Sequence, residues 1–321
     1  MSLQPYALAS LSDFKDTLGK GGTAKDDVIE RAINTASRLI EAELGRRLRY
    51  RAPEEIAGGA NIVAAVALTN TASTSLTIAA QPSAARTLIV TITDTDRSVK
   101  AGTVTVTGTV GGATTTEVFD LADCQSRYHG RKFFTAVASI VTTSVTGASS
   151  ADTIAVGTSL GMVEYHDPRC SYRIRLREWP VYSIAEINED PNLDYAAATA
   201  LTVSTDYQFS AAGEVTRVDT SGHPMEFWSG YRAVKVRYSA GYGALSTVPP
   251  DIKDLCLRLA GSKVMEFERG SLGMSSVSDA QGNFTRLGST LTRDQREELA
   301  EYRRSDIFTT TAERDFDEEA A

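Results

Sequence analysis

The chain has 321 residues, which is long enough for two domains of average size with substantial hydrophobic cores. Hydrophobic residues make up 42% and charged residues 23%, values typical of a globular protein rather than a disordered or fibrous one. The net charge of −8 argues against sequence-independent binding of nucleic acid, because such binding depends on Lys and Arg that neutralise phosphates. No apolar run is long enough to span a bilayer, and residues 1–10 lack the pattern of a signal peptide, so we expect no membrane partner.

Charge and composition divide the chain into three segments. Residues 1–55 contain nine basic and nine acidic side chains, and residues 56–161 contain six of each, so the whole negative charge lies in 162–321. The middle segment is rich in Thr, Val, Ala and Gly, and glycines lie close to both of its ends. We therefore predict a discontinuous core formed by 1–55 and 162–321, with 56–161 as a separate inserted domain.

The first segment is predicted to be helical. A short helix capped by Ser12 runs to Leu18, where glycines follow. Beyond it, apolar residues recur at steps of three and four, which places them on one face of a helix from about Lys25 to Leu44, ended by Gly45.

The middle segment is predicted to consist of strands, because β-branched residues alternate with polar ones between turn-forming residues. This pattern indicates a β-sandwich of roughly 100 residues. The strand-like runs are Ser75–Ile78, Thr87–Thr93, Gly102–Val110, Thr116–Phe119, Phe133–Ile140 and Thr153–Val156.

The third segment begins with further strand-like runs between Ser171 and Tyr238. A helix is predicted from Pro250, which suits a first helical turn, to the residue before Gly270. A Ser- and Gly-rich stretch follows, and then a polar helix over 293–304 and an acidic tail.

No motif for catalysis or cofactor binding is recognisable. The stretch GKGGT (Gly19–Thr23) has the residue types of a phosphate loop but not its spacing. The three histidines and three cysteines are scattered, without the spacing of metal ligands or of a disulfide framework. We therefore expect no enzyme activity, no cofactor, and no catalytic or metal-binding residues.

Two groups of arginines are candidates for a binding surface. One follows the predicted helix, and the other lies on one face of a predicted strand. Each group is either a solvated face or a surface that pairs with carboxylates on another chain, which suits the planar guanidinium, whereas DNA contact fits the acidic total poorly. The candidate subunit-interface residues are Arg46, Arg47, Arg49, Arg51, Arg173, Arg175 and Arg177.

The C-terminal segment of about 290–321 carries five arginines against ten acidic residues in its last 32 positions. Its apolar stripe is too thin to bury a helix strongly within its own domain. It is either a frayed terminus or an arm that becomes ordered on a partner protein. The residues available for docking are Leu291, Leu299, Tyr302, Arg303, Arg304, Ile307, Phe308 and Phe316.

An ordered set of phrases resembles the head-tail connector (adaptor) proteins of tailed bacteriophages. The resemblance covers about 1–55 and 162–269. In chain order, the phrases are Ile40-Glu41 with Gly45-Arg46, WPVYSIAEI (Trp179–Ile187), Asp206-Tyr207 with Gly213–Arg217, VKVRYSAGY (Val234–Tyr242) and VPPDIKDLCLRLA (Val248–Ala260).

The resemblance implies a structural protein of the virion neck, located between capsid and tail and assembled in the host bacterial cytoplasm. Members of the family form a ring, commonly of twelve copies, between the portal protein and the tail or stopper protein. DNA passes through the lumen of the ring without specific binding. The C-terminal arm is then expected to dock on the portal, as the corresponding part does in the family.

The middle segment departs from the family, in which the helix leads almost directly into the strands. Through Thr105–Phe119 and Lys132–Ile140, it is similar to the small Ig-like domains of phage virion proteins. The expected fold class is therefore α+β, with a helical connector core, a small antiparallel β-region and an inserted all-β, Ig-like sandwich. The alternative function is a surface- or carbohydrate-binding accessory virion protein in which the β-domain is the working part.

Overall fold

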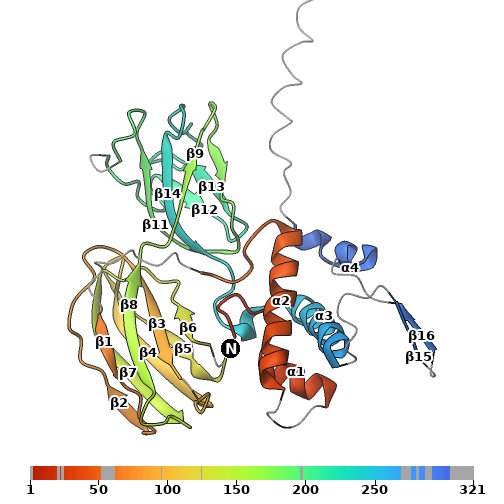
Figure 1. The fold of residues 1–321 in the computed structure, drawn as a ribbon. Coiled ribbons are helices and arrows are strands. Elements are labelled where there is room, and N and C mark those ends of the chain that lie inside the picture. Colours follow the sequence, from red (N-terminus) through yellow and green to blue (C-terminus); the bar gives the residue numbers. More distant parts are fainter. Residues whose placement is uncertain are drawn as a thin grey trace, which may run out of the picture.

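The computed structural model of the chain describes residues 3–19, 22, 25–51, 62–94, 96–123, 125–195, 198–268, 276–279, 282–285 and 291–303. Helices and strands occupy separate stretches of the chain, and two β-regions lie beside a group of helices (Figure 1). In the described part of the chain, no helix is both long and apolar enough to cross a membrane.

Residues 62–159 form two four-stranded antiparallel sheets, with strand orders β1-β8-β3-β6 and β2-β7-β4-β5. Every second residue of β4 is buried, as alternation predicts, and the inner faces of both sheets share one hydrophobic cluster. We call this unit the sandwich. Its strands are β1 (Val63–Ala67), β2 (Ser73–Ser75), β3 (Thr87–Thr93), β4 (Ala101–Val110), β5 (Ala113–Asp120), β6 (Arg127–His129), β7 (Ala136–Thr146) and β8 (Thr153–Ser159).

Residues 162–240 form a second β-region of two three-stranded antiparallel sheets, β10-β13-β12 and β11-β14-β9. A separate hydrophobic cluster holds them together, with the fully buried Tyr238 as its largest side chain. The strands are β9 (Met162–His166), β10 (Arg173–Arg175), β11 (Val181–Glu189), β12 (Tyr207–Phe209), β13 (Glu214–Arg217) and β14 (Val234–Ala240). A hairpin of β15 (Ser276–Asp279) and β16 (Gly282–Thr285) follows later in the chain.

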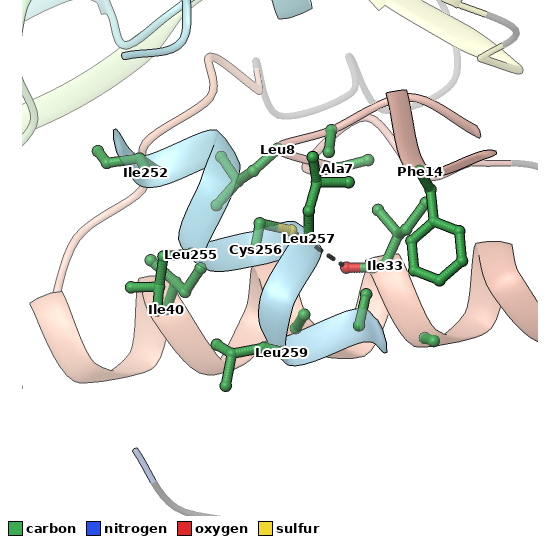
Figure 2. Packing of buried hydrophobic residues seen from close by; sticks show 14 of the residues in the cluster. Ala7, Leu8, Phe14, Ile33, Ile40, Ile252, Leu255, Cys256, Leu257 and Leu259 are labelled. Atoms are coloured by element: carbon green, nitrogen blue, oxygen red, sulfur yellow. Dashed lines mark hydrogen bonds between the residues drawn. The ribbon is translucent and has the colours of Figure 1, made fainter. Parts of the chain in front are cut away.

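The helices are α1 (Leu11–Leu18), α2 (Asp26–Leu44), α3 (Pro250–Glu268) and α4 (Arg293–Glu298). The predicted long helix is confirmed as α2, and Gly45 follows it with a left-handed φ of 66°. The cap of α1 is Ser10 rather than the expected Ser12, because the Ser10 hydroxyl and the Asp13 carboxylate form a capping box. Figure 2 shows the apolar faces of α2 and α3 packed together, with Cys256 directed at the Ile33 carbonyl.

The predicted helical core is wrong. Most of the regular structure in the described residues is β, and 162–240 buries its own hydrophobic cluster instead of packing its strands onto helices. Val234, Val236 and Tyr238 are fully buried in β14, whose neighbours β9 and β11 cover it from both edges. Apart from the β15–β16 hairpin between α3 and α4, helices and antiparallel strands still lie in separate stretches, so the fold is α+β only in the broad sense. The domain boundaries at 55/56 and 161/162 stay a prediction.

The two β-regions are joined directly, because the chain passes from β8 into β9 through Gly161 (Figure 1). Gly161 has a φ of 82°, and a Cβ there would lie 2.7 Å from the Phe133 ring and 3.0 Å from the Tyr238 carbonyl oxygen. This connection therefore requires glycine. Across the same boundary, the Arg237 guanidinium donates to the Ala85 carbonyl at 2.7 Å.

Truncation of a helical core residue tests this packing. Ile40 is fully buried in the cluster that α2 shares with α3, so Ile40→Ala is expected to lower the free energy of unfolding by about 2–5 kcal/mol. The control is Thr35→Ala on the exposed face of α2, where about 0.5 kcal/mol or less is expected. Urea denaturation followed by circular dichroism measures both, and equal effects would contradict the packing.

Candidate functional site

Arg46 connects three segments that are far apart in the sequence. Gly45 ends α2 and turns the chain, so that the Arg46 side chain enters the interior, where it is only 3% exposed. Its Nη1 donates to the Trp179 carbonyl at 2.5 Å, and its Nε donates to the Tyr302 carbonyl at 2.8 Å. The guanidinium carbon lies 3.4 Å from the centroid of the Trp179 ring, in cation–π geometry.

The electrostatics of this buried charge are balanced by neighbouring groups. Burial lowers the pKa of Arg46 to about 10, and Tyr242, Glu178 and Glu41 act in the opposite direction. The side chain therefore remains charged at neutral pH. Because a buried guanidinium must keep its hydrogen bonds to offset desolvation, the two carbonyls that it binds are fixed in place.

A second set of hydrogen bonds holds the backbone that follows Arg46. The Tyr242 N–H donates to the Leu48 carbonyl at 2.8 Å, and the Tyr50 N–H donates to the Tyr242 carbonyl at 3.0 Å. Arg49 is also buried, and its guanidinium donates to the Gly243 carbonyl. At Gly241, which has a φ of 98°, a Cβ would come within 2.8 Å of the Leu48 and Tyr50 backbone. We call this set the Arg46 junction, and it consists of Glu41, Gly45–Arg51, Glu178–Trp179, Gly241–Gly243 and Tyr302.

A groove of about 610 Å³ lies beside the Arg46 junction. It runs between the C-terminal half of α2 and residues of the second β-region. Five arginines and three glutamates line it, which gives these side chains a net charge of +2. The charged lining residues are Arg38, Arg46, Arg47, Arg51, Arg177, Glu41, Glu164 and Glu178.

The glutamates of the groove are engaged by the chain itself. Glu41 forms an ion pair with Arg51 at 2.8 Å, and Glu178 accepts the Arg47 backbone N–H at 2.7 Å. Burial acts to raise the pKa of Glu164, but bonds from His166 and Tyr238 outweigh it and lower the pKa.

Three arginine side chains of the groove remain exposed: Arg38, Arg47 and Arg177. The Arg38 guanidinium lies 5.1 Å from the centroid of the Tyr6 ring, and Arg177 Nε lies 3.9 Å from Glu178. Exposed guanidiniums bind carboxylates and phosphates in bidentate geometry. The groove can therefore bind an anionic group, and carboxylates on another protein chain are suitable partners.

The structure brings part of the two predicted arginine groups together. Arg46, Arg47 and Arg51 line the groove with Arg177, although more than 120 positions separate them in the sequence. Arg49 is buried in the Arg46 junction. The Arg173 guanidinium pairs with Glu214 on the neighbouring strand β13 at 3.0 Å, and Arg173 and Arg175 do not line the groove. Contact of these arginines with a neighbouring subunit stays a prediction.

Part of the candidate docking arm is held in place by contacts with other residues of the same chain. Leu291 and Leu299 are buried in the helical cluster, so the expectation that this segment has too little apolar surface to be buried is wrong for these two residues. The Tyr302 hydroxyl donates to Asp251 at 2.6 Å, and Arg303 pairs with Glu43. The expected helix over 293–304 is shorter, with α4 followed by a 3₁₀ turn at Ala300–Tyr302.

The remaining predicted docking residues lie outside the described residues: Arg304, Ile307, Phe308 and Phe316. Docking of the arm on a portal stays a prediction.

Sequence reasoning missed Glu178 and Trp179 as contacts of the arginine groups, although Trp179 begins one of the resemblance phrases.

No known family model matches the chain, and no curated protein matches it significantly.

A smaller cavity of about 230 Å³ lies between the sandwich and the loop after β14. His129 lines it beside Arg49 and Tyr50, and the Nδ1 of this histidine has no hydrogen-bond partner among the described residues. Burial, assisted by Arg127 and Arg49, lowers the pKa of His129 to about 4. This histidine is therefore neutral at physiological pH.

Substitution of Arg46 tests the junction. Arg46→Ala leaves the partly buried carbonyls of Trp179 and Tyr302 without their guanidinium donor and is expected to lower the free energy of unfolding by about 1–3 kcal/mol. Arg46→Lys is expected to restore little of this loss, because an ammonium cannot reach both carbonyls in the planar geometry. The matched control is Arg47→Ala at the exposed neighbouring position, where about 0.5 kcal/mol or less is expected. A full rescue by lysine would show that charge alone matters.

The lowered pKa of His129 predicts a pH dependence. The unfolded state binds a proton near pH 6.5 and the folded state only near pH 4, so stability falls as the pH drops through this window. Between pH 7 and 4.5, the wild type is expected to lose about 2 kcal/mol more than His129→Gln, measured by urea denaturation at each pH. Parallel pH profiles of the two proteins would contradict the assignment.

Proposed function

We propose that this protein is a structural virion protein, a head-tail connector that forms a ring between the portal and the tail or stopper. The proposal rests on the ordered phrases that resemble that family and on the groove beside the Arg46 junction. DNA would pass through the lumen of the ring. The net charge of −8 suits a channel that must release DNA, because a basic lining would retain phosphates.

The observation that carries the proposal is the contact between separate phrases. Arg46 belongs to the first phrase and binds Trp179, the first residue of the second. Tyr242 ends the fourth phrase and pairs with the backbone that follows Arg46. Asp251, in the fifth phrase, accepts the Tyr302 hydroxyl. The first, second and fourth phrases thus meet at one junction, and the fifth contacts it through Tyr302, which lies outside the phrases. Proteins that share these phrases would share the junction.

The groove supports assembly with other copies of the chain. Its lining has a net charge of +2, whereas the whole chain has a net charge of −8, so a neighbouring subunit would offer an excess of carboxylates to its exposed guanidiniums. We propose that a carboxylate-bearing surface of the adjacent subunit occupies the groove in the ring. Such contacts also fix orientation, because like charges disfavour other arrangements.

Negative-stain electron microscopy and sedimentation velocity of the full chain test the proposed function. Closed rings of uniform diameter are expected. A monomer that binds glycans on an array would instead favour the surface- or carbohydrate-binding accessory protein. A monomer without either property would contradict both functions.

Charge reversal at the groove tests its place in the ring. Arg47→Glu combined with Arg177→Glu is expected to reduce the fraction of rings at least tenfold in 0.1 M salt, while the chain stays folded. Each exposed pair contributes only about 0–1 kcal/mol, but every subunit of a ring repeats the loss. The control is Arg169→Glu combined with Arg293→Glu, two exposed arginines that do not line the groove. If the two double variants form rings equally well, the groove is not the interface.

A further inference from the structure

Three aspartates meet at one end of the sandwich. The register of β3 and β8 pairs Thr93 with Thr153, so the residue after β3 and the residue before β8, Asp94 and Asp152, lie at the same edge of the sheet. Asp96 follows two positions later. One carboxylate oxygen from each of the three lies within 4.8 Å of the others.

The carboxylate of Asp152 is the most informative of the three, because this residue is fully buried. Its Oδ2 accepts the Ser98 hydroxyl at 3.0 Å and the Ser149 N–H at 2.6 Å. Its Oδ1 is buried and has no hydrogen-bond partner in the described part of the chain. A buried carboxylate oxygen without a partner is costly unless a cation or a proton satisfies it.

Nearby basic side chains are engaged elsewhere. Lys100 Nζ donates to the Arg97 carbonyl at 3.0 Å, and the Arg97 guanidinium pairs with Asp27 on α2. Among the described residues, no ion pair reaches any of the three aspartates. The cluster is therefore a concentration of carboxylates that no basic side chain among the described residues neutralises.

We propose that Asp94, Asp96 and Asp152 bind a calcium ion. Carboxylate oxygens are the hard ligands that Ca²⁺ selects, and Ca²⁺ accepts six to eight oxygens in irregular geometry. The site suits this ion because Asp152 approaches from the interior while Asp96 is exposed, which leaves the outer side open to water. Mg²⁺ is a poorer match, since it demands near-ideal octahedral ligands and gives up its waters reluctantly.

The ion would connect the sandwich to the helices. Arg97 lies between Asp96 and Ser98, and its guanidinium reaches Asp27 at 2.5 Å and Glu30 at 3.3 Å, both on α2. An ion bound by Asp94, Asp96 and Asp152 would therefore also fix the position of the backbone from which Arg97 extends. Calcium would stabilise the contact between the two units as well as the loop itself.

Isothermal titration of the chelator-treated full chain with CaCl₂ tests the proposal, together with thermal melting in chelator and in 10 mM Ca²⁺. One ion per chain is expected, with a Kd of roughly 1 mM or below. The melting temperature is expected to rise by about 2 °C or more in 10 mM Ca²⁺. A parallel titration with MgCl₂ is expected to give weaker binding.

Substitutions of the proposed ligands distinguish Ca²⁺ binding at this site from Ca²⁺ binding elsewhere on the chain. Asp96→Asn removes the charge of the exposed ligand and is expected to weaken Ca²⁺ binding at least tenfold. In chelator this variant is expected to melt at or above the wild-type temperature, because a repulsion has been removed. Asp152→Asn is expected to abolish Ca²⁺ binding. If Asp152→Asn does not fold, the Ca²⁺ affinity of Asp96→Asn is the test of the site.

The control for these variants is Asp219→Asn, because Asp219 is a partly exposed aspartate that likewise accepts backbone N–H groups in a turn. It is expected to bind Ca²⁺ like the wild type. No heat of binding in the wild type would overturn the proposal and would assign the cluster to protonated carboxyls. An equal rise in melting temperature for the wild type and Asp96→Asn would overturn it as well, because the ion would then bind elsewhere.

Discussion

The described structure depends on the buried guanidinium of Arg46. This guanidinium donates hydrogen bonds to the carbonyls of Trp179 and Tyr302 and lies against the Trp179 ring. The end of α2, the second β-region and the C-terminal segment therefore all contact the same charged group. A charge inside a protein is stable only while its partners remain, which makes the three segments mutually dependent. The walls of the groove come from α2 and from the second β-region, which Arg46 joins. Arg47 and Arg177 are exposed among its lining residues.

The local sequence pattern predicted those helices and strands whose buried residues all pack against one hydrophobic core. The three- and four-residue spacing in α2 and the left-handed position at Gly45 are properties of a few neighbouring residues, and both agree with the structure. The alternation in Gly102–Val110 likewise predicted β4, in which every second residue is buried. In these segments, the burial that tertiary packing imposes coincides with the pattern that the sequence carries.

Contacts between distant residues could not be predicted in this way. The helical core was expected from the resemblance to connector proteins, whereas the pairing of β14 with β9 and β11 gives the strands of 162–240 a core of their own. Burial of Leu299 depends on a helical cluster built mainly from α2 and α3. The aspartate cluster was missed because only the register of β3 against β8 brings Asp94 to Asp152, 58 positions later.

Hydrogen exchange of Arg46→Ala is the most direct test of the claim that one buried charge holds three segments. Faster exchange is predicted at the same time in 178–187 and 299–303 and in the last turn of α2, because each loses a shared partner. Exchange in β3 of the sandwich is predicted to stay unchanged. An increase confined to residues 45–48 would contradict the claim, since the segments would then be held together without Arg46.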